Sequence, residues 1–149
     1  MAIREWNPGE LLEISGFFWK TCALHAAVKM GVFTVIGDGS LTAGEMAQKI
    51  DGAVNGVDRL LNALVAMELL NKSNDKFSNT PSGKNLLSKN SPKYLGHIIM
   101  HHHHLLESWS ALDQAVKSGK PQRTRSSHSK EEWPDSFLMT MFNIAMGMS

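Results

Sequence analysis

The stretch from residue 41 to residue 80 constrains the fold of this chain more than any other. It contains two segments with the apolar spacing of helices, separated by a turn at residues 51–52. The first segment opens with Thr42 followed three residues later by Glu45, the arrangement of a capping box in which each residue satisfies the backbone amide of the other. Asp51-Gly52 is predicted to end this helix, with the glycine in the left-handed conformation.

The second helix of this stretch is predicted to begin near Asn55 and to continue to residue 70. Residues 71–79 follow with the composition of a two-stranded hairpin, and Asn74-Asp75 forms its turn. Helix, turn, helix and hairpin in this order predict a winged helix-turn-helix, with the hairpin as its wing and its only β-structure. We therefore expect a mainly α fold, extended by additional N- and C-terminal helices.

A winged helix often binds DNA, and the charge of its second helix tests that function. Such a helix enters the major groove and needs basic or amide side chains on its outer face. Here it offers Arg59 and Asn62, while Asp58 and Glu68 give it a net negative charge. Because affinity for DNA depends on neutralising phosphates, we expect no nucleic-acid partner.

Composition indicates one soluble domain of ordinary charge. The chain has 149 residues, which is enough for a single compact core, and a formal net charge of +1. Cys22 is the only cysteine, so an internal disulfide is excluded. No window has the roughly 20 apolar residues of a membrane span, and the N-terminus has no apolar signal core. We expect a cytoplasmic protein.

The N-terminal helix is predicted to begin after Asn7-Pro8 and to end near Met30. Its apolar residues are too many for one narrow stripe, and a helix that is apolar on most sides is buried on most sides. The remaining cover could come from the C-terminal helices or from a second subunit. The residues proposed for such an interface are Leu11, Phe17, Phe18, Trp19 and Leu24.

Three further helices are predicted after the wing. Thr80-Pro81 begins a short one, and Pro92 opens a long one that continues to about Ser118. A final helix from Asp135 is apolar and rich in methionine, so we expect a partner chain or a further domain to cover it. The expected core stripe of the long helix consists of Leu95, Ile98, Ile99, His102, Leu105, Leu106, Trp109, Leu112 and Val116.

Four consecutive histidines, residues 101–104, lie inside the long helix and point in four directions. His102 is predicted to be packed in the core, and His103 to form a surface pair with Glu107. His97 and His101 have the i, i+4 spacing of helical metal ligands, but one helix presents too few donors for a structural zinc site. We therefore expect no metal, and consider instead that this flank lines a pocket.

The sequence contains none of the common catalytic or cofactor motifs. It has no nucleophile elbow, no glycine-rich loop after a strand, and no alternation of strands and helices that would build a nucleotide-binding sheet. We expect no catalytic residue, no cofactor-binding residue and no catalysis by this chain alone.

Several segments in order resemble the N-terminal domain of S-adenosylmethionine-dependent small-molecule O-methyltransferases. They are residues 24–33 (LHAAVKMGVF), 41–47 (LTAGEMA), 60–64 (LLNAL) and 76–81 (KFSNTP), then the stretch 104–112 and the helix 137–148. The resemblance covers essentially the whole chain and rests on the order and spacing of these segments.

The resemblance implies that residues 1–149 form a winged-helix dimerisation domain and that a methyltransferase domain, which binds S-adenosylmethionine, would follow residue 149. The N-terminal helix would then intertwine with that of a second copy, giving a homodimer. The helices near the junction would roof the pocket of a small-molecule acceptor. The residues that this region contributes to such a lid are His104, Trp109, Met139, Phe142 and Met146.

Two other functions stay open at this point. A winged-helix transcriptional regulator that senses an apolar ligand would bind DNA through the helix near Asn55. A histidine metal module would retain zinc or nickel at the run 101–104. The sequence identifies neither the acceptor nor the oligomeric state.

Overall fold

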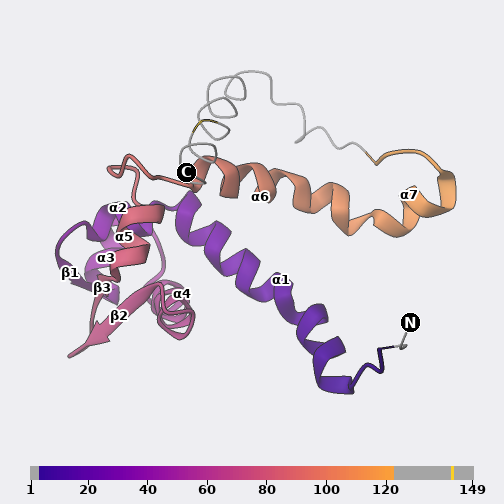
Figure 1. The fold of residues 1–149 in the computed structure, drawn as a ribbon. Coiled ribbons are helices and arrows are strands. Elements are labelled where there is room, and N and C mark those ends of the chain that lie inside the picture. Colours follow the sequence, from indigo (N-terminus) through magenta and orange to yellow (C-terminus); the bar gives the residue numbers. More distant parts are fainter. Residues whose placement is uncertain (1–3, 123–141, 143–149) are drawn as a thin grey trace.

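The computed structural model describes residues 4–122 and residue 142. Figure 1 shows one gathered unit built from α2 to α5 and the strands, here called the winged unit, and two helical arms, α1 and α6–α7, that extend away from it. The elements are α1 (Pro8–Lys29), α2 (Val32–Ile36), β1 (Ser40–Thr42), α3 (Ala43–Ile50), α4 (Val54–Ala66), β2 (Leu70–Ser73), β3 (Lys76–Asn79), α5 (Pro81–Leu87), α6 (Gly96–Ser110) and α7 (Leu112–Ser118).

The core of the protein lies inside the winged unit and at the C-terminal end of α1. Its largest fully buried side chains include Phe33 from α2, Phe77 from β3 and Leu61 from α4. Helices α3 and α4 pack on one another, and both contribute apolar side chains to this cluster. The mainly α winged-helix prediction is confirmed.

The sheet has three antiparallel strands in the order β1-β3-β2. β2 and β3 form the predicted hairpin, with Asn74 and Asp75 at φ 47° and 59° in its turn. β1 was not predicted: it pairs Leu41 with Phe77 along the other edge of β3. A three-residue strand is too short to show the alternation that identifies strands in a sequence.

The capping box of α3 is confirmed, and two predicted helix ends need correction. The Glu45 amide donates to Thr42 Oγ1 at 3.2 Å, and the Thr42 amide donates to the Glu45 carboxylate at 2.7 Å. The left-handed residue after α3 is Asp51, at φ 52°, and not Gly52. α4 ends at Ala66, well before residue 70, because Leu70 begins β2 although its apolar spacing continues that of the helix.

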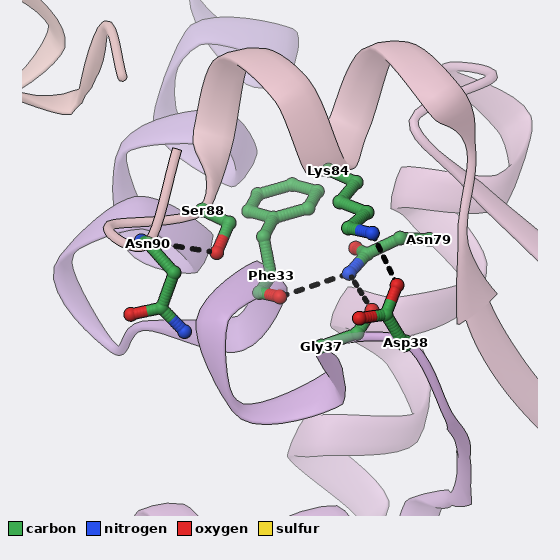
Figure 2. A network of polar contacts seen from close by, with 7 residues as sticks. All are labelled: Phe33, Gly37, Asp38, Asn79, Lys84, Ser88 and Asn90. Atoms are coloured by element: carbon green, nitrogen blue, oxygen red, sulfur yellow. Dashed lines mark hydrogen bonds and ion pairs between the residues drawn. The ribbon is translucent and has the colours of Figure 1, made fainter. Parts of the chain in front are cut away.

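Asn79 joins the end of the sheet to α2 (Figure 2). Its side-chain amide donates to the carbonyl oxygens of Phe33 and Gly37, each at 2.9 Å. Beside it, the Lys84 ammonium on α5 pairs with the Asp38 carboxylate in the loop after α2. A side chain from the wing thus holds the C-terminal end of this five-residue helix, where the Phe33 carbonyl also accepts from the Gly37 amide.

The long helix predicted from Pro92 to Ser118 is two shorter helices. α6 begins at Gly96, where a Cβ atom would lie 1.9 Å from the ring of Tyr94, and the chain bends at Ala111 before α7. The predicted core stripe is wrong at four positions. His102, Trp109, Leu112 and Val116 are exposed, whereas Ile99 packs against the core and the others are half-buried: Leu95, Ile98, Leu105 and Leu106. Periodicity identifies an apolar face but not what covers it.

Candidate dimerisation surface

The N-terminal two-thirds of α1 exposes an apolar surface that no described part of the chain covers. Trp19 is 69% exposed and Phe18 is 54% exposed, and their rings lie 5.3 Å apart between centroids. Single exposed apolar side chains are ordinary on proteins, but a continuous set on one helix marks an interaction site. The α1 surface consists of Leu11, Leu12, Ile14, Phe17, Phe18 and Trp19.

The C-terminal third of α1 is held in the fold. Ala27 and Val28 are buried in the core, and α1 contacts α2, α4 and α6. Leu24, predicted for the interface, is half-buried and packs against the core, so it lies where α1 joins the winged unit. The helix is thus anchored at one end and presents its apolar surface at the other (Figure 1).

Local interactions begin α1 independently of any partner. The Glu10 amide donates to Asn7 Oδ1 at 3.0 Å, and the Asn7 amide donates to the Glu10 carboxylate at 3.2 Å, which is a complete capping box. Arg4 pairs with the same carboxylate at 2.9 Å and lies over the ring of Trp6. Pro8 occupies the first helical turn. The end that carries the apolar surface therefore has its own helix start.

A second exposed apolar surface lies on the other arm. Trp109, near the end of α6, is 64% exposed, and Leu112 and Val116 of α7 are also exposed. Their spacing places them along one side of α6–α7 despite the bend at Ala111. Both arms thus have apolar surfaces for which the described part of the chain supplies no cover.

The predicted lid residues fall on different parts of the chain. His104 is half-buried on α6, and Trp109 lies more than one turn further along the same helix. Phe142 is helical and 58% exposed. Met139 and Met146 lie outside the described residues.

The histidines are arranged differently from the prediction. His102 is exposed, not packed, whereas His25 of α1, which the sequence analysis did not single out, is buried at 4% exposure. His103 of α6 meets His25 edge-on, with 5.5 Å between ring centroids. The sequence did not single out His25, because nothing in the residues around it distinguishes a buried histidine from an exposed one. Within residues 4–122, no three His, Cys, Asp or Glu side chains lie close enough to hold a metal ion.

The amide expected to read bases is used inside the domain. Asn62 Nδ2 donates to the backbone carbonyl of Asp58 at 2.7 Å, and Asn62 Oδ1 accepts from Lys72 of the wing at 3.0 Å. The Lys72 ammonium also lies 4.9 Å from the centre of the Phe77 ring. Two of the groups that would contact DNA are therefore engaged with one another.

Comparison with known proteins decides between these functions. The family model of the O-methyltransferase dimerisation domain matches residues 12–89. The chain belongs to this family. The match includes the exposed α1 surface from Leu12 onward, the whole winged unit and the helix that carries Asn62.

Relatives and solved structures agree with the family. The N,N-dimethyltransferase OxyT of Streptomyces rimosus is 30% identical over 128 residues, which are 83% of this chain and 36% of OxyT. An O-methyltransferase family protein from Burkholderia thailandensis is similar in structure with a TM-score of 0.81 at 26% identity, over 97% of this chain and 44% of that one. Human N-acetylserotonin methyltransferase, solved in complex with S-adenosylmethionine, has the same fold over 97% of this chain and 47% of its own, with a TM-score of 0.75 at 20% identity.

The chain spans less than half the length of each of these proteins. Its dimerisation domain corresponds to their N-terminal part. Within the described residues, no helix is both long enough and apolar enough to cross a membrane.

Proposed function

We propose that this chain forms a homodimer through α1 and serves as the dimerisation domain of an S-adenosylmethionine-dependent methyltransferase. The observation that supports the homodimer is the apolar surface of α1, six side chains on a helix that is anchored at one end and exposed along the rest. A second copy of the same helix supplies a surface of matching chemistry, as expected for a two-fold interface.

The energetics of this surface favour association. Burying a large apolar side chain contributes about 1.5–3 kcal/mol before the cost of ordering is subtracted. Trp19, Phe18 and Phe17 are aromatic, and aromatic anchors dominate the binding energy of interfaces. Because α1 is already capped and helical, little backbone ordering opposes its association.

Cofactor and acceptor binding belong, in this proposal, to the methyltransferase domain that follows in the relatives. The chain itself supplies the dimer and part of the wall over the acceptor. His104 and Trp109 of α6, with Met139, Phe142 and Met146, are the residues proposed for that wall. The names of the relatives include both N- and O-methyltransferases, so the proposal extends to a small-molecule acceptor and not to a particular acceptor atom.

Light scattering across a dilution series tests the homodimer. Wild-type protein is expected to have the mass of a dimer, and Trp19→Glu is expected to shift it to the monomer, because the interface would have to bury a charge. Val54→Glu is the matched control: the exposed fraction of Val54, 55%, is similar to the 54% of Phe18, but Val54 belongs to α4 and is not part of the α1 surface.

Two results would contradict the homodimer. One is a wild-type mass of one chain at every concentration. The other is dissociation by Val54→Glu together with retention of the dimer in Trp19→Glu. Circular dichroism on each variant establishes that the helices remain folded.

A further inference from the structure

The contact between α1 and α6 contains a pair of histidines that the dimerisation surface does not use. His25 of α1 and His103 of α6 meet at 88° between ring planes, with 5.5 Å between centroids. His25 is 4% exposed, and the Nδ1 atoms of both rings are buried without a hydrogen-bond partner among the described residues. Two ionisable rings thus form part of the packing that joins one arm to the other.

Edge-on packing of this kind suits neutral imidazoles. The edge of one ring carries positive partial charge and the face of the other carries negative partial charge, so the neutral pair attracts. A proton added at the buried Nδ1 of either ring would place positive charge on an atom that water does not reach, and protons on both rings would place two like charges in contact. The geometry therefore depends on both rings remaining neutral.

The groups that act electrostatically on the pair are Lys29 and neighbouring histidines. His102 acts on His25, and Lys29 and His104 act on His103, all in the direction that opposes protonation. α2, which also packs on α1, has no titratable side chain, and the charged residues of α4 are Asp58 and Arg59. Glu107, the acidic residue of α6, is exposed.

We propose that the contact between α1 and α6 is a pH-sensitive clasp, closed while His25 and His103 are neutral and loosened when either ring accepts a proton. The clasp is a property of the single chain and does not depend on dimer formation. Where the proposed dimer forms, loosening of α1 would also weaken the dimer, and that consequence rests on the proposed function.

The direction of the effect follows from the two protonation states. Burial, with the neighbouring positive charges, lowers the pKa of His25 and of His103 below the ordinary 6.5. Below pH 6.5 the unfolded chain therefore binds more protons than the folded one, so stability rises with pH in this window. The stabilisation is complete above pH 6.5 and is lost as the pH falls through the lowered pKa values.

The direct test uses the wild-type chain and needs no variant. NMR titration of the histidine Cε1 protons between about pH 8 and about pH 5 is expected to give His25 and His103 midpoints below 6.5. Hydrogen-exchange protection factors over the same range are expected to fall at the C-terminal end of α1 and in α6, while those of α3 and α4 stay constant. These measurements are made at concentrations where the oligomeric state is known, so failure of the dimer leaves the result interpretable.

Variants assign the effect to the pair. His25→Phe with His103→Phe preserves two aromatic rings without ionisable atoms, and is expected to remove the loss of α1–α6 protection at low pH. His97→Gln is the control. It removes another histidine of α6, whose ring contacts Tyr94 and not His25, and the pH dependence is expected to persist. Should the double variant not fold, His103→Phe alone is expected to reduce the pH dependence.

Either of two results would overturn the clasp. The first is a His25 or His103 midpoint at or above 6.5. The second is α1–α6 protection that is independent of pH in wild type, or equally dependent on pH in the phenylalanine variants.

Discussion

The winged unit and the arms contain similar apolar side chains but use them differently. In the winged unit Phe33 and Phe77 are at most 1% exposed, because they belong to a core cluster that the helices and strands of the same chain enclose. On α1, Phe17 and Phe18 are about half exposed although they belong to an equally regular helix. The winged unit therefore completes its own core, whereas the arms have apolar surfaces that call for another chain or domain.

This difference explains how one short domain can be stable by itself and still expose apolar surface for association. Folding free energy comes from the enclosed core, so the arms are free to keep apolar groups for association. The anchored end of α1, at Ala27 and Val28, links the two functions because the same helix enters the core and leaves it. Substitutions in the two regions should thus have separable effects.

The largest effect is expected for Phe33→Ala in the winged unit. Removing a fully buried phenylalanine leaves a cavity that the surrounding helices cannot fill, which costs about 3–5 kcal/mol of unfolding free energy. The matched change on the arm is Phe18→Ala, measured in the Trp19→Glu background to remove the dimer. There the loss of unfolding free energy should be within about 0.5 kcal/mol, because Phe18 is not part of the core. Urea denaturation measures both, and equal losses would break the distinction between the two regions.

Asn79→Ala should give the next largest effect. The side chain donates two hydrogen bonds to carbonyls at the end of α2, and their loss is expected to cost about 1–3 kcal/mol. The lower part of that range is favoured because Asn79 Oδ1 is itself buried without a partner in the described part of the chain.

The control for Asn79 is Lys117→Ala on the arm. Lys117 pairs with Asp113 at 3.5 Å, and both side chains are exposed. An exposed pair contributes about 0–1 kcal/mol, so urea denaturation should detect little change. A Lys117→Ala loss as large as that of Asn79→Ala would contradict the view that polar contacts matter most where they close the core.

The winged unit could be predicted from the sequence because its signals are local. Thr42 and Glu45 mark a helix start, Asn74-Asp75 marks a turn, and each works without knowledge of the rest of the fold. What failed was non-local: β1 forms only because β3 is present, and Leu70 joins a strand despite helical spacing.

The prediction of the candidate dimerisation surface followed the same division. The excess of apolar residues on α1 is a composition signal, so Phe17, Phe18 and Trp19 could be predicted as interface candidates. The same reasoning placed Trp109 and His102 in a core, and it did not find His25. Burial of these residues depends on where α6 lies relative to α1, and no sequence pattern specifies that angle.

Thr42→Ala should destabilise the winged unit by about 1 kcal/mol, because it removes the side-chain acceptor for the first turn of α3. Asn7→Ala removes the same kind of cap from α1. The N-terminal end of α1 extends away from the core. Loss of the Asn7 cap should therefore fray that end of the helix without lowering the free energy of global unfolding. Urea denaturation distinguishes them, and hydrogen exchange at residues 8–12 should report the fraying. A global loss in Asn7→Ala would show that the arm unfolds together with the winged unit.

Asp75→Gly should produce the smallest change and the opposite sign. Asn74 and Asp75 both have positive φ, the conformation of a tight hairpin turn, and glycine adopts it without the strain imposed by a Cβ atom. The greater freedom of glycine in the unfolded chain offsets part of this gain, so the net stabilisation is expected to stay below about 1 kcal/mol. Ser73→Gly is the control, since Ser73 is the last residue of β2, directly before the turn. It should destabilise by about 0.5–1 kcal/mol, because a strand residue does not need positive φ and glycine loses more conformational entropy on folding. If both variants destabilise the wing equally, the turn conformation is not what limits its stability, and the enclosure of Phe77 would have to account for it alone.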